Sequence, residues 1–330
     1  MKIYLHIGMH KTGTTSIQAF ARENVNLLRK YGVFWPVMLK ENKVARQHSH
    51  LWRLVQYGQA EAALAVLGNA ITDAEKQGCQ SLLLSGEGFS NASEPEIATI
   101  LDGLKGHEIV VIVYFRNIYG YARSAFQQHL KYADRRTPAR LLPLIIQRNL
   151  NYDALLARWQ KFVPGITLDV RSYEREKKNL VPGFFAALGI PEPAVKSKMA
   201  DESNRSMDPV IQVMLAAIEC DKSGGDFRRT RDAYYREFGG MKMNTALMAD
   251  IFTAICQGAP HEYSDPLLEA YRDELLAPPD VQPPLSLAEQ AQYFSSLAGF
   301  ARRMARRKRF ESGRFYSAWR WARQKLRKKD

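Results

Sequence analysis

Four short apolar runs lie in the N-terminal part of the chain, and helical patterns separate them. The runs cover residues 3–7, 81–85, 109–115 and 166–171. After the first run, apolar side chains recur at helical spacing as far as Gly32, and after the last run a helical pattern covers residues 179–190, closing at Gly189. Short, continuously apolar runs are typical of strands buried on both faces of a parallel sheet. The pattern therefore predicts an α/β fold with a central parallel β-sheet flanked by helices.

The loop after the first predicted strand carries a phosphate-binding pattern. Gly8 to Thr15 has the glycine spacing of a P-loop, G-x-x-x-x-G, followed by two hydroxyl residues. Thr14 stands where the nucleotide-triphosphate version has its lysine, and the lysine is at position 11 instead. Such a loop directs backbone N–H groups and the positive end of the next helix toward one point, where a phosphate can bind. The displaced lysine suits a cofactor with a single 5′-phosphate that carries the group to be transferred, and such a cofactor needs no metal.

The second and third runs bring polar side chains to the sheet edge where ligands of open α/β sheets bind. Residues 81–85 lead into Glu87, which two glycines flank, and we expect a substrate to approach this carboxylate closely. Residues 109–115, which we expect to form a central strand, lead into Arg116, and Ser124 follows in the first turns of the next helix. An arginine fork and a serine hydroxyl together suit a terminal phosphate dianion.

Together these motifs resemble the sulfotransferases that use 3′-phosphoadenosine-5′-phosphosulfate (PAPS), especially their bacterial carbohydrate-type members. The stretch His10-Lys-Thr-Gly-Thr-Thr-Ser-Ile-Gln18 is similar to the 5′-phosphosulfate loop of that family. The resemblance implies a P-loop NTPase-like three-layer fold, PAPS as donor, 3′-phosphoadenosine 5′-phosphate (PAP) as product, and no metal. It also implies cofactor contacts from Lys11, Thr12, Gly13, Thr14, Thr15, Ser16, Arg116 and Ser124.

The resemblance also implies roles for residues near the transferred group. Lys11 is expected to stabilise the leaving phosphate, and Glu87 to act as general base, because these enzymes have a Glu or His at a strand end in this region. An ordinary carboxylate is a weak base, so we expect partial burial to raise the pKa of Glu87. His48 and His50 are candidates to contact the acceptor. The alternative bases are His50 and His10, and the latter stands where relatives commonly have proline.

A polar loop at residues 202–206 precedes another predicted helix. In the family that the chain resembles, an Asn-x-Ser loop here lies close to the nucleotide, so Arg205 is a candidate to reach the 3′-phosphate. A helix-capping role for Ser206 explains the same loop equally well.

We expect residues 1–207 to form the PAPS-binding core, with residues 33–80 as a helical insertion on the acceptor side. Residues 208–276 are expected to form a helical part of the same domain. Residues 277–330 read as a Pro-rich connector followed by a basic amphipathic helical tail. A chain of 330 residues with 46% hydrophobic content can fill the core of one large domain.

Composition and terminus indicate the compartment. Met1 runs almost directly into the first strand, and no run of about 18 apolar residues is present, so we expect a cytoplasmic protein without a signal peptide or membrane span. The three cysteines, Cys79, Cys220 and Cys256, lack metal-ligand spacing and fit a reducing compartment.

The positive charge of the chain is concentrated at its C-terminal end. Residues 301–330 contain thirteen Lys and Arg and two acidic residues, which gives +11 of the total +13. Phe315, Trp319, Ala322 and Leu326 share one face of the predicted helix, and such a helix favours peripheral association with an anionic membrane surface. The alternative is that this face packs on the domain or on a second subunit. We do not expect nucleic-acid binding, because no nucleic-acid-binding fold is recognisable.

The resulting hypothesis is a PAPS-dependent sulfotransferase of EC 2.8.2 type. Its acceptor hydroxyl would belong to a saccharide or glycolipid, which the resemblance alone implies. One alternative is a P-loop kinase or NTPase using ATP and Mg²⁺, against which the position of Lys11 and the arginine in place of a strand-end aspartate argue. Another is a non-catalytic protein that binds a phosphate or a lipid.

Overall fold

The computed structural model describes residues 1–40, 43–132, 142–198, 262–278, 295 and 299. The chain divides into two compact units, of which the first comprises Met1–His129, Asp134–Arg205 and Phe252–Pro279. The second comprises Leu130–Ala133, Ser206–Ile251 and Asp280–Asp330, and lies almost wholly outside the described residues. Arg205 and the basic tail 301–330 also lie outside them, so their roles and the boundaries at 207 and 276 stay predictions.

The first unit is built on a five-stranded parallel sheet with the order β2-β5-β1-β6-β7. The strands are β1 (Lys2–His6), β2 (Val33–Phe34), β5 (Ser81–Ser85), β6 (Glu108–Phe115) and β7 (Thr167–Ser172). Four of them coincide with the four apolar runs of the sequence, and β1 rather than β6 is the middle strand. The edge strand β2 was not predicted, because two residues are too few to show a period. The predicted α/β class with a central parallel sheet is confirmed.

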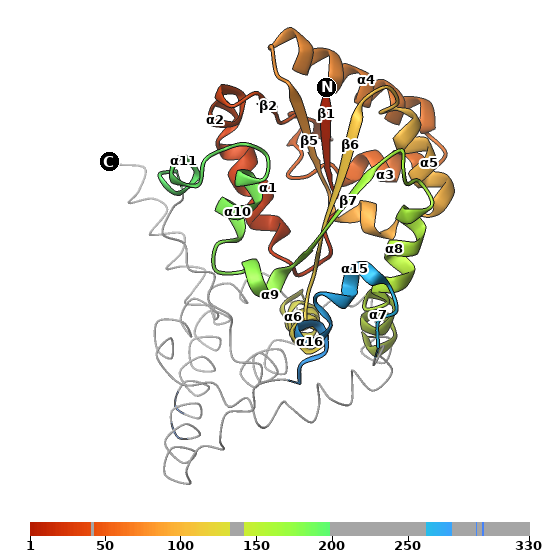
Figure 1. Cartoon of the computed structure of the whole chain (residues 1–330), viewed down its shortest axis with the longest axis vertical. Coiled ribbons are helices and arrows are strands. Elements are labelled where there is room, and N and C mark those ends of the chain that lie inside the picture. The colour runs from red at the N-terminus through yellow and green to blue at the C-terminus, as the bar shows by residue number, and fades with distance from the viewer. Residues whose placement is uncertain (41–42, 133–141, 199–261, 279–294, 296–298, 300–330) are drawn as a thin grey trace, which may run out of the picture. The chain divides into compact units, whose positions relative to one another are not determined.

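Helices cover both faces of this sheet (Figure 1). One face carries α1 (Thr14–Glu23), α2 (Val25–Lys30), α10 (Leu180–Ala186) and α11 (Glu192–Lys196), and the other carries α3 (Ser49–Gln56), α4 (Ala60–Lys76), α5 (Glu94–Asp102) and α8 (Tyr152–Gln160). The other described elements are the hairpin β3 (Leu39–Lys40) and β4 (Lys43–Val44), the 3₁₀ helix η1 (Glu87–Asn91), α6 (Ile118–Tyr132), α7 (Leu142–Asn149), α9 (Tyr173–Glu176), α15 (Pro266–Glu269) and α16 (Arg272–Leu276). The first unit is therefore the three-layer arrangement that the sequence predicted.

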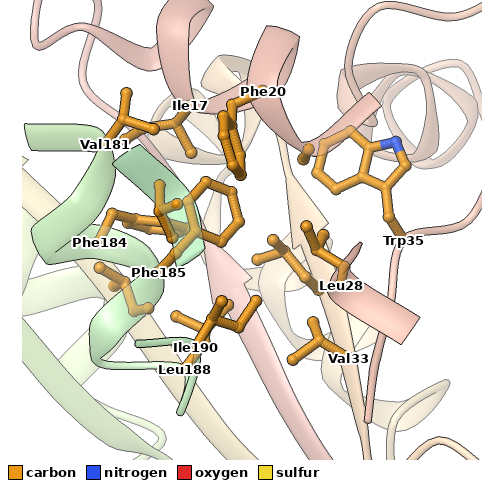
Figure 2. Packing of buried hydrophobic residues seen from close by; sticks show 14 of the residues in the cluster. Ile17, Phe20, Leu28, Val33, Trp35, Val181, Phe184, Phe185, Leu188 and Ile190 are labelled. Atoms are coloured by element: carbon orange, nitrogen blue, oxygen red, sulfur yellow. The ribbon is translucent and has the colours of Figure 1, made fainter. Parts of the chain in front are cut away.

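One cluster of the hydrophobic core lies between the sheet and the α1/α10 layer. Tyr4 of β1 is level with Leu83 of β5 and Val110 of β6, and side chains at this register belong to the cluster that also contains α1 and α10 (Figure 2). Phe20 of α1 packs on Phe185 of α10 with 4.8 Å between the ring centroids. Burying an aliphatic or aromatic side chain contributes about 1.5–3 kcal/mol. This cluster therefore anchors α1, and with it the loop that precedes α1.

Residues 33–80 contain the helices α3 and α4, and they also supply a strand. β2 pairs in parallel with β5, so this segment completes one edge of the main sheet. Gly58, which has φ 75°, lies between α3 and α4. Among the described residues, no helix combines the length and the apolar content that crossing a bilayer requires.

Candidate active site

The loop from Ile7 to Gly13 joins β1 to α1 at the carboxyl edge of the sheet. Three of its residues have left-handed backbone conformations, with φ 39° at Gly8, 71° at Lys11 and 75° at Gly13. Within the described part of the chain, Lys11 is the one non-glycine residue with positive φ. That conformation costs an L-residue about 1–2 kcal/mol. Strain of this kind is concentrated at functional sites, where the surrounding structure holds it in place.

The start of α1 presents main-chain donors. Ser16 N–H donates to the carbonyl oxygen of Gly13 at 3.0 Å. In the described part of the chain, the N–H groups of Gly13, Thr14 and Thr15 donate to no main-chain carbonyl. These three groups lie at the positive end of the ten-residue α1, which is the arrangement that binds anions.

The hydroxyl groups of this loop are used in different ways. Thr12 is buried and donates through Oγ1 to the carbonyl oxygen of Met9 at 2.7 Å, so its side chain braces the loop. Thr15 is exposed and Ser16 is half-buried. Thr14 is buried and its hydroxyl donates to Oε1 of Glu87. A ligand at the helix start would therefore meet Thr15 and the main chain rather than the hydroxyl of Thr12.

Glu87, at the start of η1, is held by the loop through both carboxylate oxygens. Its Oε1 accepts the hydrogen bond from Thr14, and its Oε2 lies 2.7 Å from Nδ1 of His10. The side chain of His10 is 41% exposed, whereas that of Glu87 is 21% exposed. His10 is therefore the more accessible member of this pair.

The pKa of Glu87 is lowered, and the expectation that burial would raise it is wrong in its net effect. Burial is the largest single influence and does raise the pKa. The hydrogen bonds from His10 and Thr14 and the electrostatic attraction exerted by His10 and Lys11 act in the opposite direction and together outweigh it. The environment of Glu87 therefore stabilises a carboxylate that stays charged, rather than one poised to accept a proton.

The two glycines that flank Glu87 allow α3 to pack closely against this turn. Packing therefore accounts for both glycines without the close approach of a substrate that the sequence suggested. A Cβ at Gly86 would lie 2.7 Å from the backbone nitrogen of Ser49, and one at Gly88 would lie 3.1 Å from its Cβ. The N–H of Glu87 donates to Oε1 of Gln47 at 3.1 Å, and that of Gly88 donates to Oγ of Ser49 at 2.9 Å. Gln47 and Ser49 thus position Glu87, and no sequence motif pointed to them.

A buried polar network lies beneath the loop. Nδ1 of His6 is 2.9 Å from Oγ of Ser85, and the same oxygen accepts a hydrogen bond from Gln18 at 3.1 Å. Nδ1 of His48 accepts from the N–H of Ser85 and its Nε2 donates to the carbonyl oxygen of Pro36, both at 3.0 Å. The histidines are 0% and 1% exposed, and burial lowers the pKa of His6 to about 3 and that of His48 to about 4. Both are neutral structural residues, so the expectation that His48 contacts the acceptor is wrong.

Arg116 follows β6 and lies against the loop. Its Nη1 donates to the carbonyl oxygen of Lys11 at 2.6 Å, and its guanidinium lies 4.8 Å from the ring centroid of Tyr173. Its Nε is 3.8 Å from a carboxylate oxygen of Glu174 and is buried without a hydrogen-bond partner among the described residues. Ser124 is half-buried in α6, and in the described part of the chain no hydrogen bond joins it to Arg116.

His10 also borders a cleft of about 360 Å³. The walls come from the loop, from η1 and the residues after it, from the end of α7 and from α8, and the lining residues are Met9, His10, Ser90, Asn91, Ala92, Ser93, Gln147, Arg148, Asn149, Asn151, Ala154, Leu155 and Arg158. Glu87 and His50 do not line it, and His50 lies half-buried in the first turn of α3. No motif in the sequence indicated that α7 and α8 border a cleft.

The chain was compared with protein-family models, with curated proteins and with solved structures. No protein-family model and no curated protein matches the chain. Among solved structures, the chain is similar to the crystal structure of a sulfotransferase from Alicyclobacillus acidocaldarius, with a TM-score of 0.38 and 16% identity. That similarity covers 66% of this chain and 90% of the other. The five-stranded parallel sheet and the helices on both of its faces define the fold.

Proposed function

We propose that this protein is a PAPS-dependent sulfotransferase that moves a sulfuryl group to a hydroxyl of a saccharide or glycolipid. The observation that carries the proposal is that three neighbouring strands bring complementary groups to one loop. β1 leads into Lys11 and the helix-start N–H groups, β5 leads into Glu87, and β6 leads into Arg116. Glu87 contacts this loop through His10, and Arg116 contacts it through the carbonyl oxygen of Lys11. The proposed anion site at the start of α1, the proposed acid–base pair of His10 and Glu87, and the guanidinium of Arg116 therefore lie around the same loop.

The residues present fit a donor with phosphates at both ends of its ribose. The N–H groups of Gly13, Thr14 and Thr15 would hold the 5′-phosphate. Arg116, whose buried Nε lacks a hydrogen-bond partner among the described residues, would hold the 3′-phosphate together with Ser124. When bound, PAPS supplies the sulfuryl group.

Lys11 and the helix-start N–H groups would stabilise the negative charge that develops on the departing 5′-phosphate. Preorganised donors aimed at developing charge are commonly the largest contribution to catalysis of this type. Lys11 is held in its left-handed conformation by the loop, and Arg116 donates to its carbonyl oxygen. The main chain at Lys11 is therefore held in place before a ligand binds.

The proton of the acceptor hydroxyl passes, in this proposal, to the His10–Glu87 pair. In a neutral His10, Nδ1–H would donate to the Glu87 carboxylate, which leaves Nε2 with its lone pair. Nε2 would take the hydroxyl proton during transfer of the sulfuryl group to the acceptor oxygen, and the desulfated donor would leave as PAP. Glu87 stabilises the imidazolium that results, a role that requires it to remain charged. The lowered pKa of Glu87 supports this division of roles over one in which Glu87 itself is the base.

Binding of PAP tests the proposal against the kinase or NTPase alternative. We expect calorimetry to show binding of PAP without added Mg²⁺ and much weaker binding of ATP with Mg²⁺, and radiolabelled PAPS to label a saccharide acceptor. Lys11→Ala should abolish the labelling while PAP binding falls less, because the backbone donors remain. Tight binding of ATP with Mg²⁺ and none of PAP would replace sulfuryl transfer by phosphoryl transfer as the proposed reaction.

A further inference from the structure

The cleft beside His10 offers hydrogen-bonding groups that the protein itself does not use. Asn149 and Asn151 each employ one end of the side-chain amide, the first as a donor to a tyrosine hydroxyl and the second as a helix cap. Asn91 and Gln147 make no side-chain hydrogen bond to any other described residue. An amide both donates and accepts, as does a hydroxyl group. A wall with several such amides suits a ligand that carries many hydroxyl groups.

The charged side chains of the cleft are all basic. Its lining contains Arg148 and Arg158 besides His10, and no aspartate or glutamate. Arg158 is committed to the protein, since it donates to the carbonyl oxygens of Ser90, Ala92 and Ala154 at 2.9–3.1 Å and so fixes the segment after Glu87.

Arg148 is the basic group of the cleft that remains for a ligand. It is exposed at the end of α7 and has no ion-pair partner among the described residues. Its positive charge contributes to lowering the pKa of Arg158, behind the larger effect of burial, so the two guanidinium groups are close enough to interact. An anion bound beside Arg148 would relieve this repulsion.

We propose that the cleft binds the acceptor, and that the acceptor is a saccharide with an anionic substituent, such as a uronic acid, held by Arg148. The part of this proposal that concerns the acceptor rests on the proposed sulfotransferase function. The cleft volume of about 360 Å³ is at the small end of ligand pockets, which suits one or two sugar rings. With the anion at Arg148, a ring hydroxyl lies toward His10, which borders the same cleft.

Two glycosides that differ in one group test this selectivity. Methyl β-D-glucuronide and methyl β-D-glucoside share the ring and its hydroxyls, and only the first has a carboxylate. We expect saturation-transfer NMR on the full-length protein with PAP to give the glucuronide about 10-fold or more tighter binding, as for a charge-assisted arginine contact. In Arg148→Gln the ratio of the glucoside Kd to the glucuronide Kd should fall to about 1, and Arg148→Lys should retain part of the preference for the glucuronide. Arg29→Gln, an exposed arginine of α2 outside the cleft, is the matched control and should keep the full preference.

The outcomes separate this proposal from the proposed function. Equal affinity for the two glycosides, or an unchanged preference in Arg148→Gln, overturns the proposal for the anionic acceptor even where PAP binds normally. Failure of PAP to bind overturns the sulfotransferase function, while an Arg148-dependent preference for the glucuronide would still establish the anionic saccharide site. Thermal unfolding of each variant shows whether the fold is intact, and the Arg148→Lys result decides the matter if Arg148→Gln is unstable.

Discussion

Replacement of Glu87 by glutamine tests the His10–Glu87 pair most directly. Thr14 donates to Oε1 of Glu87, and Nδ1 of His10 lies 2.7 Å from Oε2. In Glu87→Gln the amide oxygen can keep the bond from Thr14, which turns the amide NH₂ toward Nδ1 of His10. Nδ1 must then accept a hydrogen bond, and the ring proton moves to Nε2. His10 would thereby lose the lone pair that the mechanism assigns to the acceptor hydroxyl.

The expected loss is that of a general base. Such a group contributes about 10²–10⁴-fold to turnover, which corresponds to about 2.7–5.5 kcal/mol in the activation barrier. Glutamine has the shape of glutamate and can retain the bond from Thr14, so the fold should be unaffected. PAP affinity should also stay close to that of the wild type, because the backbone donors of α1 and Arg116 are unchanged.

The assay compares the wild type, Glu87→Gln, His10→Ala and the double variant, using labelled PAPS and one saccharide acceptor. If the two residues act as a unit, each single variant should lose about as much turnover as the double variant. The tautomer of His10 can be read separately from ¹⁵N chemical shifts of protein labelled at histidine. We expect the protonated ring nitrogen to change from Nδ1 to Nε2 in Glu87→Gln.

Different results would assign the base differently. Wild-type turnover in Glu87→Gln would refute the pair. A loss in Glu87→Gln with full activity in His10→Ala would return the role of base to Glu87. If Glu87→Gln and His10→Ala both kept wild-type turnover and His50→Ala were inactive, the role of base would pass to His50.

Three further predictions concern the loop, the second cation and the buried histidines. Because Lys11 has φ 71°, the Lys11→Gly variant should be at least as stable to urea as the Lys11→Ala variant. At an ordinary helical or extended position, glycine makes a protein less stable than alanine does by about 0.5–1 kcal/mol. A Lys11→Gly variant less stable than Lys11→Ala would contradict the left-handed conformation. Arg116→Ala should weaken PAP binding by about 1.5–3 kcal/mol and binding of adenosine 5′-monophosphate much less, and calorimetry that shows equal losses would mean that Arg116 acts only by supporting the loop. The folded-state pKa values of His6 and His48, about 3 and about 4, lie below the unfolded value of 6.5. The unfolded chain therefore binds more protons than the folded chain below pH 6.5. The free energy of unfolding consequently falls as the pH decreases from 6.5 toward 4. Each histidine should lower the free energy of unfolding by about 2 kcal/mol at pH 5 relative to pH 7. A free energy of unfolding that is the same at both pH values would disprove their burial in neutral form.

The parts of the site that could be predicted from sequence are those set by local pattern. Glycine spacing marks the loop, and continuous apolar runs mark the strands, so the ends of β5 and β6 were expected at the ligand edge. Glu87 and Arg116 do meet the loop there, through Thr14 and through the carbonyl oxygen of Lys11. A parallel sheet brings strand ends together whatever the intervening sequence, and this is why the prediction succeeded.

The parts that could not be predicted depend on contacts between distant segments. Burial of Glu87 could be expected from its place after an apolar run, but the direction of its pKa shift depends on Thr14 and His10, more than seventy residues away in the chain. Gln47 and Ser49 hold the Glu87 turn without belonging to any motif. The periodicity of a helix shows which face is buried and not whether another face borders a cleft.

The two departures of the loop from the P-loop pattern are physically connected. Thr14 is 2% exposed and lies in hydrogen-bond contact with Glu87, so a lysine at position 14 would place its ammonium group against that carboxylate and compete with His10 for it. With threonine at 14, the carboxylate instead contacts a neutral hydroxyl and the imidazole of His10, and Lys11 supplies the positive charge of the loop. In the proposed mechanism, the shift of the lysine to position 11 leaves the Glu87 carboxylate to His10 and Thr14. A triphosphate site has its lysine between the β- and γ-phosphates, where such a pair would repel the ligand. The arrangement is consistent with a loop built to hold a single phosphate next to a group that accepts a proton.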